Sequence, residues 1–254
     1  MNELFSTLRE AIAALDAADP SRKRFGAAQH GYRLAPPLAA AELAALEARL
    51  GHALPDDLRA YVGEFSAGGA GPYYGLVPPD RAGLIAGPAQ ALYRVGLPIA
   101  HLGCGYLAVV ALDGAARGEV WIDARWLAVS APIAATATAF VLDWVDRLAH
   151  AQWLEPHIPR AHCALVEALG GYLLNLQDAR DDKFTDEELR AVLGQFGPGS
   201  LVVTAHQAEP WFADEEWVDP CVACAQLIEN LGEAGLRPDV IERGLPPRPL
   251  REAP

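Results

Sequence analysis

The sequence predicts an α+β fold in which a mixed or antiparallel sheet is flanked by helices and followed by a mainly helical C-terminal extension. Residues 39–66 repeat their apolar side chains at helical spacing. Residues 107–123 hold two short apolar runs joined through an Asp-Gly turn, which is typical of a β-hairpin. Two prolines within 156–159 end this unit. We therefore expect one domain over 1–155 and an acidic, mainly helical region with a Pro-rich tail over 156–254.

The first element is an amphipathic helix over residues 1–17. Its inward apolar residues are Leu4, Phe5, Leu8, Ile12 and Leu15. The segment carries acids and has no basic start before an apolar block, so it does not read as a signal peptide. No run approaches the roughly 20 apolar residues of a membrane span. Together with four cysteines in 254 residues, this predicts a cytoplasmic protein with reduced thiols.

Two helices come next, over 39–50 and 55–66. The first buries Leu43, Leu46 and Leu50, and Gly51 fits a left-handed C-cap. The second begins with Leu-Pro-Asp-Asp, because proline is tolerated in a first turn and carboxylates there complement the helix dipole. Its apolar face holds Leu58, Tyr61, Val62 and Phe65.

The sheet and its closing helix follow. Leu107–Leu112 is predicted as a central strand and Val120–Asp123 as its hairpin partner. Residues 126–130 are expected to add an edge strand, and 135–149 a helix that buries Phe140, Trp144 and their apolar neighbours.

This order of elements resembles the SUKH superfamily, which contains bacterial immunity proteins of polymorphic toxin systems and fungal regulators of cell-wall synthesis. The resembling pieces are LEARLGHALPDDLRAYVGEFSAGG, PIAHLGCGYLAVVALDGAARGEVWID and AFVLDWVDRL, all within residues 34–148. Where the family often carries Asn-Gly after the second helix, this chain has Ser66-Ala67-Gly68-Gly69. The resemblance implies a helix-then-sheet fold and a protein that binds and neutralises a cognate toxin.

The formal net charge is −13 and is concentrated in the C-terminal region. Residues 1–155 hold 16 acids and 12 Lys or Arg, and 156–254 hold 17 and 8, which gives −4 and −9. Such a surface repels nucleic-acid phosphates and attracts basic partners. A role in solubility alone is the alternative.

The C-terminal region is predicted to contain a helix over 160–179, a capping box formed by Thr185 and Glu188, a strand over 200–205 and a helix that carries Cys221 and Cys224. Between the last two, acids and large rings alternate over residues 209–220. Either these rings contact a basic, partly apolar partner, or they pack into the core while the acids face water.

No recognised catalytic pattern stands out. His101 and Cys104 lie close in sequence, but a buried or turn cysteine explains Cys104. Cys221 and Cys224 have no second cysteine pair to complete a zinc site, so two core thiols explain their spacing. Residues 178–188 lack the glycine of a calcium loop. We therefore expect a protein that is not an enzyme and holds no cofactor or metal.

The sequence thus favours an immunity-type protein that neutralises a basic nuclease or deaminase toxin by direct contact, with no nucleic-acid or membrane partner. The residues expected to face the toxin are Trp211, Asp214, Glu215, Glu216 and Trp217, and after them Tyr73 and Tyr74. The alternative is an intracellular scaffold or regulatory protein with several weak partners.

Overall fold

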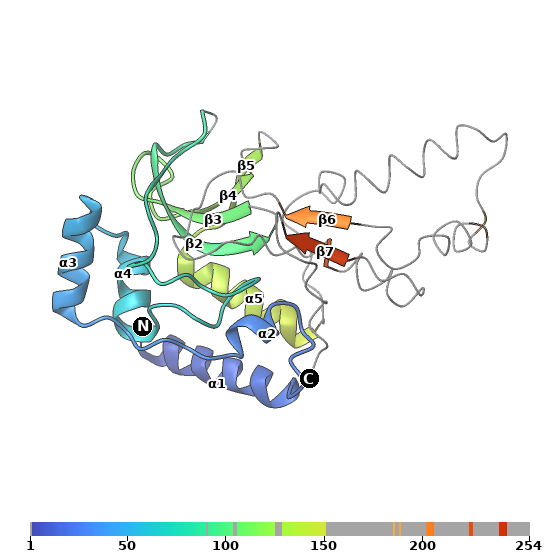
Figure 1. Ribbon diagram of the computed structural model, residues 1–254. Helices are drawn as coiled ribbons and strands as arrows, with labels where there is room; N and C mark the ends of the chain where they lie inside the picture. Colours follow the sequence, from blue (N-terminus) through green and yellow to red (C-terminus); the bar gives the residue numbers. More distant parts are fainter. Residues whose placement is uncertain are drawn as a thin grey trace.

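The computed structural model describes residues 2–89, 91–103, 106–124 and 129–150, together with 185, 188, 202–205, 224–225 and 239–242. Within these residues the fold is α+β, with a five-stranded antiparallel sheet and helices packed against it (Figure 1). The α+β prediction is confirmed. The predicted helical character of 156–254 and the boundary at 155 lie outside the described residues.

The helices follow the apolar spacing of the sequence. They are α1 (Asn2–Ala18), α2 (Ala27–His30), α3 (Ala40–Leu50), α4 (Asp56–Ala60) and α5 (Ala137–His150), and α4 continues directly into a π-helical turn, η1 (Tyr61–Phe65). The predicted apolar residues of α1 are buried except Leu4, which is 39% exposed. Gly51 caps α3 in the left-handed conformation at φ 65°, as predicted.

The sheet is a simple meander whose strand order follows the sequence. Its strands are β1 (Ile85–Ala86), β2 (Val95–Gly103), β3 (Tyr106–Ala111), β4 (Val120–Ala124) and β5 (Val129–Ala134), and all neighbours are antiparallel. The predicted hairpin is confirmed, because Val110 pairs with Val120 and Val109 with Trp121.

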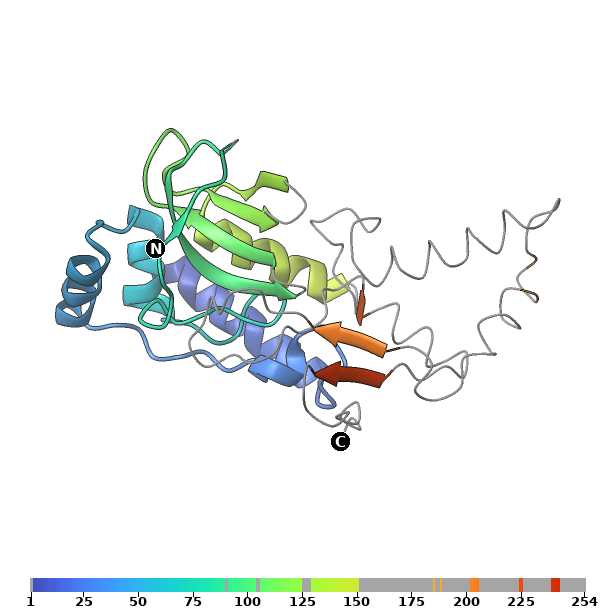
Figure 2. The same ribbon diagram turned by 45° about the horizontal axis from the view of Figure 1, so that its top comes forward.

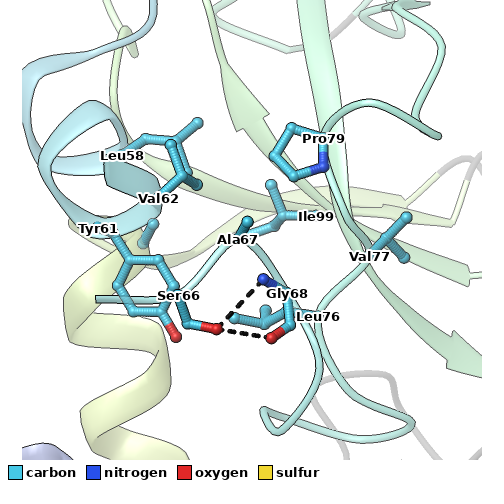
Figure 3. Close-up of a pocket in the computed structure, with 11 residues that line it drawn as sticks. Leu58, Tyr61, Val62, Ser66, Ala67, Gly68, Leu76, Val77, Pro79 and Ile99 are labelled. Atoms are coloured by element: carbon cyan, nitrogen blue, oxygen red, sulfur yellow. Dashed lines mark hydrogen bonds between the residues drawn. The ribbon is translucent and has the colours of Figure 1, made fainter. Parts of the chain in front are cut away.

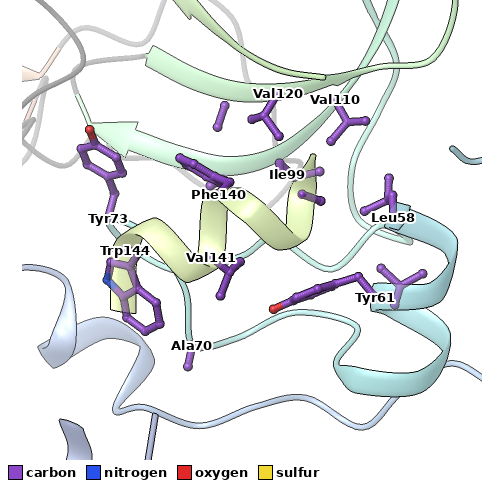
Figure 4. Close-up of a cluster of buried hydrophobic side chains, with 14 of the residues drawn as sticks. Leu58, Tyr61, Ala70, Tyr73, Ile99, Val110, Val120, Phe140, Val141 and Trp144 are labelled. Atoms are coloured by element: carbon purple, nitrogen blue, oxygen red, sulfur yellow. The ribbon is translucent and has the colours of Figure 1, made fainter. Parts of the chain in front are cut away.

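Alternate residues of the sheet enter two separate cores. On one face, Ala108 and Val110 of β3 join Val120 and Ile122 of β4 in the main cluster with α1, α4 and α5. α5 packs on this face of the sheet and α1 packs against α5, as both views show (Figures 1 and 2). Phe140 and Trp144 project from α5 into this cluster (Figure 4).

The opposite face of the sheet carries a smaller cluster. Val109 and Ala111 of β3 lie there with Trp121 of β4, and Tyr93 from the preceding loop packs edge-on against Trp121 at 5.7 Å between ring centroids. Trp121 donates its indole N–H to Glu119 at 3.0 Å. Because both faces of β3 are covered, its sequence is a continuous apolar run without alternation.

Two strands differ from the sequence prediction. β2 has no counterpart among the predicted strands, the first of which begins at Leu107. The edge strand expected at 126–130 is β5, which lies further along the chain. β2 contains Pro98 and two register shifts against β3, features that weaken a strand signal.

The described C-terminal residues include both predicted and unexpected elements. Thr185 and Glu188 form the predicted capping box: the Thr185 N–H donates to Glu188 at 2.9 Å, and the Glu188 N–H donates to the Thr185 hydroxyl at 3.2 Å. The predicted strand is β6 (Val202–Ala205), and it pairs in parallel with β7 (Asp239–Glu242), which was not predicted. Cys224 is 2% exposed and belongs to the same main cluster as the buried residues of α1, α4 and α5.

Candidate interaction surface beside the α4–η1 turn

The helix α4, with Pro55 as its N-cap, starts with Asp56-Asp57 and continues into η1, where each turn is one residue wider than in an α-helix. The Ser66 N–H donates to the Tyr61 carbonyl at 2.9 Å, which is the i→i+5 bond of a π-helix. Tyr61, Val62 and Phe65 are all buried in this turn. Single π-turns occur frequently at functional sites, so the surroundings of η1 are a candidate site.

A buried serine fixes the chain that leaves η1. Ser66 is fully buried, and its Oγ lies 2.7 Å from the Gly68 carbonyl oxygen and 3.0 Å from that of Ala35. The hydroxyl proton can satisfy only one of these acceptors at a time, and the oxygen also accepts the Gly68 N–H at 3.3 Å. The Ser66–Gly68 backbone is therefore held in place from several sides. Ser66, Ala67 and Gly68 all line the pocket that lies beside η1.

Between η1 and the sheet lies a small apolar pocket. It contains about 310 Å³ of empty space, including its open mouth. Leu58 and Val62 form one side and Val77 and Pro79 the other, while Ile99 of β2 lies at the back and the Ser66–Gly68 segment below (Figure 3). The lining is almost entirely apolar and the space is small, so the pocket suits a small aliphatic group.

Tyr61 presents its ring to the pocket. It is 1% exposed, and burial raises the pKa of its hydroxyl far above the usual range. Its Oη is buried and has no hydrogen-bond partner within the described part of the chain. The phenol is therefore neutral at physiological pH, and this wall of the pocket carries no charge.

Carboxylates stand close in sequence to the pocket residues. Asp56, Glu64 and Asp80 are exposed, and Asp80 directly follows the pocket residue Pro79. Two exposed cations accompany them, of which Arg59 pairs with Glu47 at 3.3 Å and Arg81 follows Asp80. In sequence, three exposed acids and two exposed bases thus accompany the residues that line the pocket.

The predicted contact residues Tyr73 and Tyr74 lie on a different loop. Tyr73 is 3% exposed and has a left-handed backbone, φ 56°, so its ring is buried and does not present itself to a partner as expected. Its burial follows from edge-on packing against Phe25 at 6.2 Å. Tyr74 is half-buried, with its ring 5.1 Å from Phe25 and 6.1 Å from His101.

The remaining sequence-predicted residues divide between described and undescribed parts. Trp211, Asp214, Glu215, Glu216 and Trp217 lie outside the described residues, as does Cys104. Burial lowers the pKa of His101 to about 4, so its imidazole is neutral near pH 7. No cluster of three potential metal ligands occurs in the described ranges. Across those same ranges, no helix is long and apolar enough to cross a lipid bilayer.

The sequence alone does not indicate the pocket. Its walls come from α4, η1, the loop before β1, β2 and the first residue of α5, and no local pattern links them. The Ser-Ala-Gly-Gly stretch after the second helix contributes three of the lining residues, but its sequence gives no indication of a cavity.

Comparison with known proteins gives no further assignment: no protein-family model, curated protein or solved structure matches this chain.

Proposed function

We propose that the chain is an immunity-type protein that neutralises a cognate toxin by direct contact, and that the pocket beside η1 receives an apolar side chain of that toxin. The observation that carries the proposal is a preformed apolar pocket with the exposed carboxylates of Asp56, Glu64 and Asp80 close by in sequence. One of its lining residues, Leu58, ends the Leu-Pro-Asp-Asp-Leu segment, which belongs to a piece through which the sequence resembles the SUKH superfamily.

An apolar pocket on a protein whose exposed charges are mostly acidic is compatible with the usual anatomy of a specific interface. A few buried anchors carry most of the binding energy, and the surrounding polar groups exclude water from them. Exposed charges at the edge of an interface change the association rate more than the affinity. A net charge of −13 favours encounter with a basic protein, and salt weakens this attraction because it screens exposed charges.

The acidic and aromatic segment of the C-terminal region is part of the same proposal. Trp211, Asp214, Glu215, Glu216 and Trp217 are proposed as a second contact with the toxin, on the chemistry of their side chains alone. Tyr74 is a further candidate, whereas the buried Tyr73 is left out.

The experiment combines capture of the partner with a change to the pocket. The wild-type protein is used to isolate partners from its native cells at low and high salt. The expected result is one dominant basic protein that is weakened by salt. Its affinity is then measured for the wild type and for Ala67→Leu, which adds bulk to the pocket wall, where Ala67 is 7% exposed.

A matched control separates pocket filling from general damage. Ala44→Leu places the same side chain on the exposed face of α3. We expect Ala67→Leu to weaken binding roughly tenfold or more and Ala44→Leu to leave it unchanged, with both variants folded in a thermal unfolding assay. Unchanged affinity of folded Ala67→Leu would exclude the pocket as the contact. A set of unrelated weak partners would favour the scaffold alternative.

A further inference from the structure

The loop of residues 77–82 forms one wall of the pocket beside η1. Two of its residues, Val77 and Pro79, line the pocket. Figure 3 shows the Pro79 ring on the side opposite Leu58 and Val62. The width of the pocket therefore depends on where this loop is held.

The tip of the loop is stiff. Pro78 and Pro79 fix two successive φ angles. The Arg81 N–H donates to the Pro78 carbonyl at 3.0 Å, which closes a β-turn with a proline at its second position. Because this turn does not bend easily, its position is set by its contacts with neighbouring elements.

On the side of the sheet, the loop is held by the backbone and by packing. The Val77 N–H donates to the Ile99 carbonyl of β2 at 2.8 Å, and β1, which follows the loop, also pairs with β2. Pro78 lies close to Gly68, where an added Cβ would come within 3.1 Å of the proline ring. These contacts fix the start and the end of the loop.

On the side of the helices, the loop is held by Arg49. Its Nη2 donates to the Pro79 carbonyl at 2.7 Å, and its Nη1 makes a longer contact of 3.4 Å with the Ala82 carbonyl. Arg49 is exposed and lies in the last turn of α3, a helix whose leucines are buried in the main cluster. One guanidinium thus connects a firmly packed helix to the residue that forms the pocket wall.

The shape of the guanidinium matters for this connection. Its planar fork can donate to two carbonyls at once, which a lysine ammonium on a flexible stem does less well. A positive charge in the last turn also complements the dipole of α3, and either side chain would supply that. The two hydrogen bonds to the loop are therefore the part of this role that is particular to arginine.

We propose that Arg49 is a positioning residue for the pocket: it holds the loop of residues 77–82 where Pro79 leaves the pocket open to an apolar group. A site that must first be ordered binds more weakly than a preformed one, because binding then includes the cost of ordering. The occupant is the apolar toxin side chain of the proposed function, on which the identity of the occupant rests.

The test uses the full chain and xenon as the probe, since xenon enters apolar cavities without any polar contact. Binding is followed through the xenon NMR signal, and shifts of the amide signals of Val62 and Ile99 locate it. We expect the wild type to bind xenon at the pocket and Ala67→Leu, which adds bulk to the wall, to lose this binding.

Arg49→Gln is expected to weaken xenon binding roughly two- to fivefold, because the loop is no longer held in place. It should also speed hydrogen exchange at the amides of Val77 and Arg81, which belong to the loop, since local opening becomes easier. Arg49→Lys keeps a charged donor and is expected to recover part of the affinity.

Arg94→Gln is the matched control. It removes an exposed guanidinium from a different loop, where Arg94 pairs with Asp113 at 3.3 Å, and it is expected to bind xenon as the wild type does. All variants are compared well below their unfolding temperatures, so that only folded protein is measured.

Three results would overturn the proposal: no xenon binding by the wild type, wild-type affinity in folded Arg49→Gln, or equal weakening by Arg94→Gln. None of them involves the toxin, so toxin neutralisation through another surface would still stand. Conversely, a failure to capture a toxin would remove the toxin as the occupant but would leave the role of Arg49 in the pocket.

Discussion

The Asp57 carboxylate accepts the backbone N–H of Thr138 at 2.9 Å, and so a side chain of α4 caps the N-terminus of α5. Thr136 satisfies a second N–H of the same helix, that of Ala139, at 3.1 Å. The two acceptors come from parts of the chain far apart in sequence. The Leu-Pro-Asp-Asp-Leu junction therefore joins the helical half of the fold to the helix that packs on the sheet.

Asp57→Ala is expected to destabilise the protein by about 1 kcal/mol, because the α5 terminus loses both a hydrogen-bond acceptor and a negative charge near its dipole. Asp57→Asn keeps an oxygen acceptor and should cost less. Urea unfolding curves give the free energies. Asp56→Ala is the matched control, since Asp56 is exposed one residue earlier in α4. If both alanine variants had equal stability, the cap would contribute nothing of its own.

Gly26→Ala is expected to be far more damaging than Gly51→Ala. Both glycines are left-handed, at φ 79° and 65°, so both substitutions strain the backbone by roughly 1–2 kcal/mol. A Cβ at Gly51 meets nothing within 4 Å, whereas one at Gly26 overlaps with the Tyr73 carbonyl oxygen. We expect a total loss of about 3 kcal/mol or more for Gly26→Ala. Thermal unfolding of the two variants measures the difference. Similar melting temperatures would show that the Gly26 loop and the Tyr73 loop do not touch.

The helices and the central hairpin could be predicted because their signals are local. Leu43, Leu46 and Leu50 recur at helical spacing, and all three are buried. The apolar run at Leu107–Leu112 corresponds to β3 within a residue at each end. In these segments the spacing of the apolar residues along the sequence already shows which side of the helix or strand is buried.

β2 and the candidate pocket could not be predicted for a shared reason. β2 holds Pro98 and shifts its register twice, so it is a strand because β3 pairs with it and not because of its own pattern. The pocket likewise is lined by Leu58, Val77 and Ile99, which tertiary structure alone brings to one place. The burial of Tyr73 has the same origin, since an aromatic residue on a Gly- and Pro-rich loop gives no indication of the ring it will pack against.

The pH dependence of stability is expected to report on His30. This residue is 8% exposed, and its Nδ1 accepts the Tyr32 N–H at 3.0 Å. Burial, and then the positive charge of Arg22, lowers the pKa of His30 to about 4 from its ordinary value of 6.5. Between these two pH values the unfolded chain binds more protons than the folded one. Stability must therefore fall as the pH falls from 6.5 towards 4.

The contribution of His30 to this loss is roughly 2 kcal/mol between pH 7 and pH 5. Urea unfolding at the two pH values measures it in the wild type and in His30→Gln, which removes the titrating group and should flatten the pH dependence by that amount. His101 shifts in the same direction and keeps part of the dependence in the variant. His150→Gln, at an exposed residue at the end of α5, controls for the loss of a histidine as such. A His30→Gln protein with the full wild-type pH dependence would mean that His30 is not buried in its neutral form.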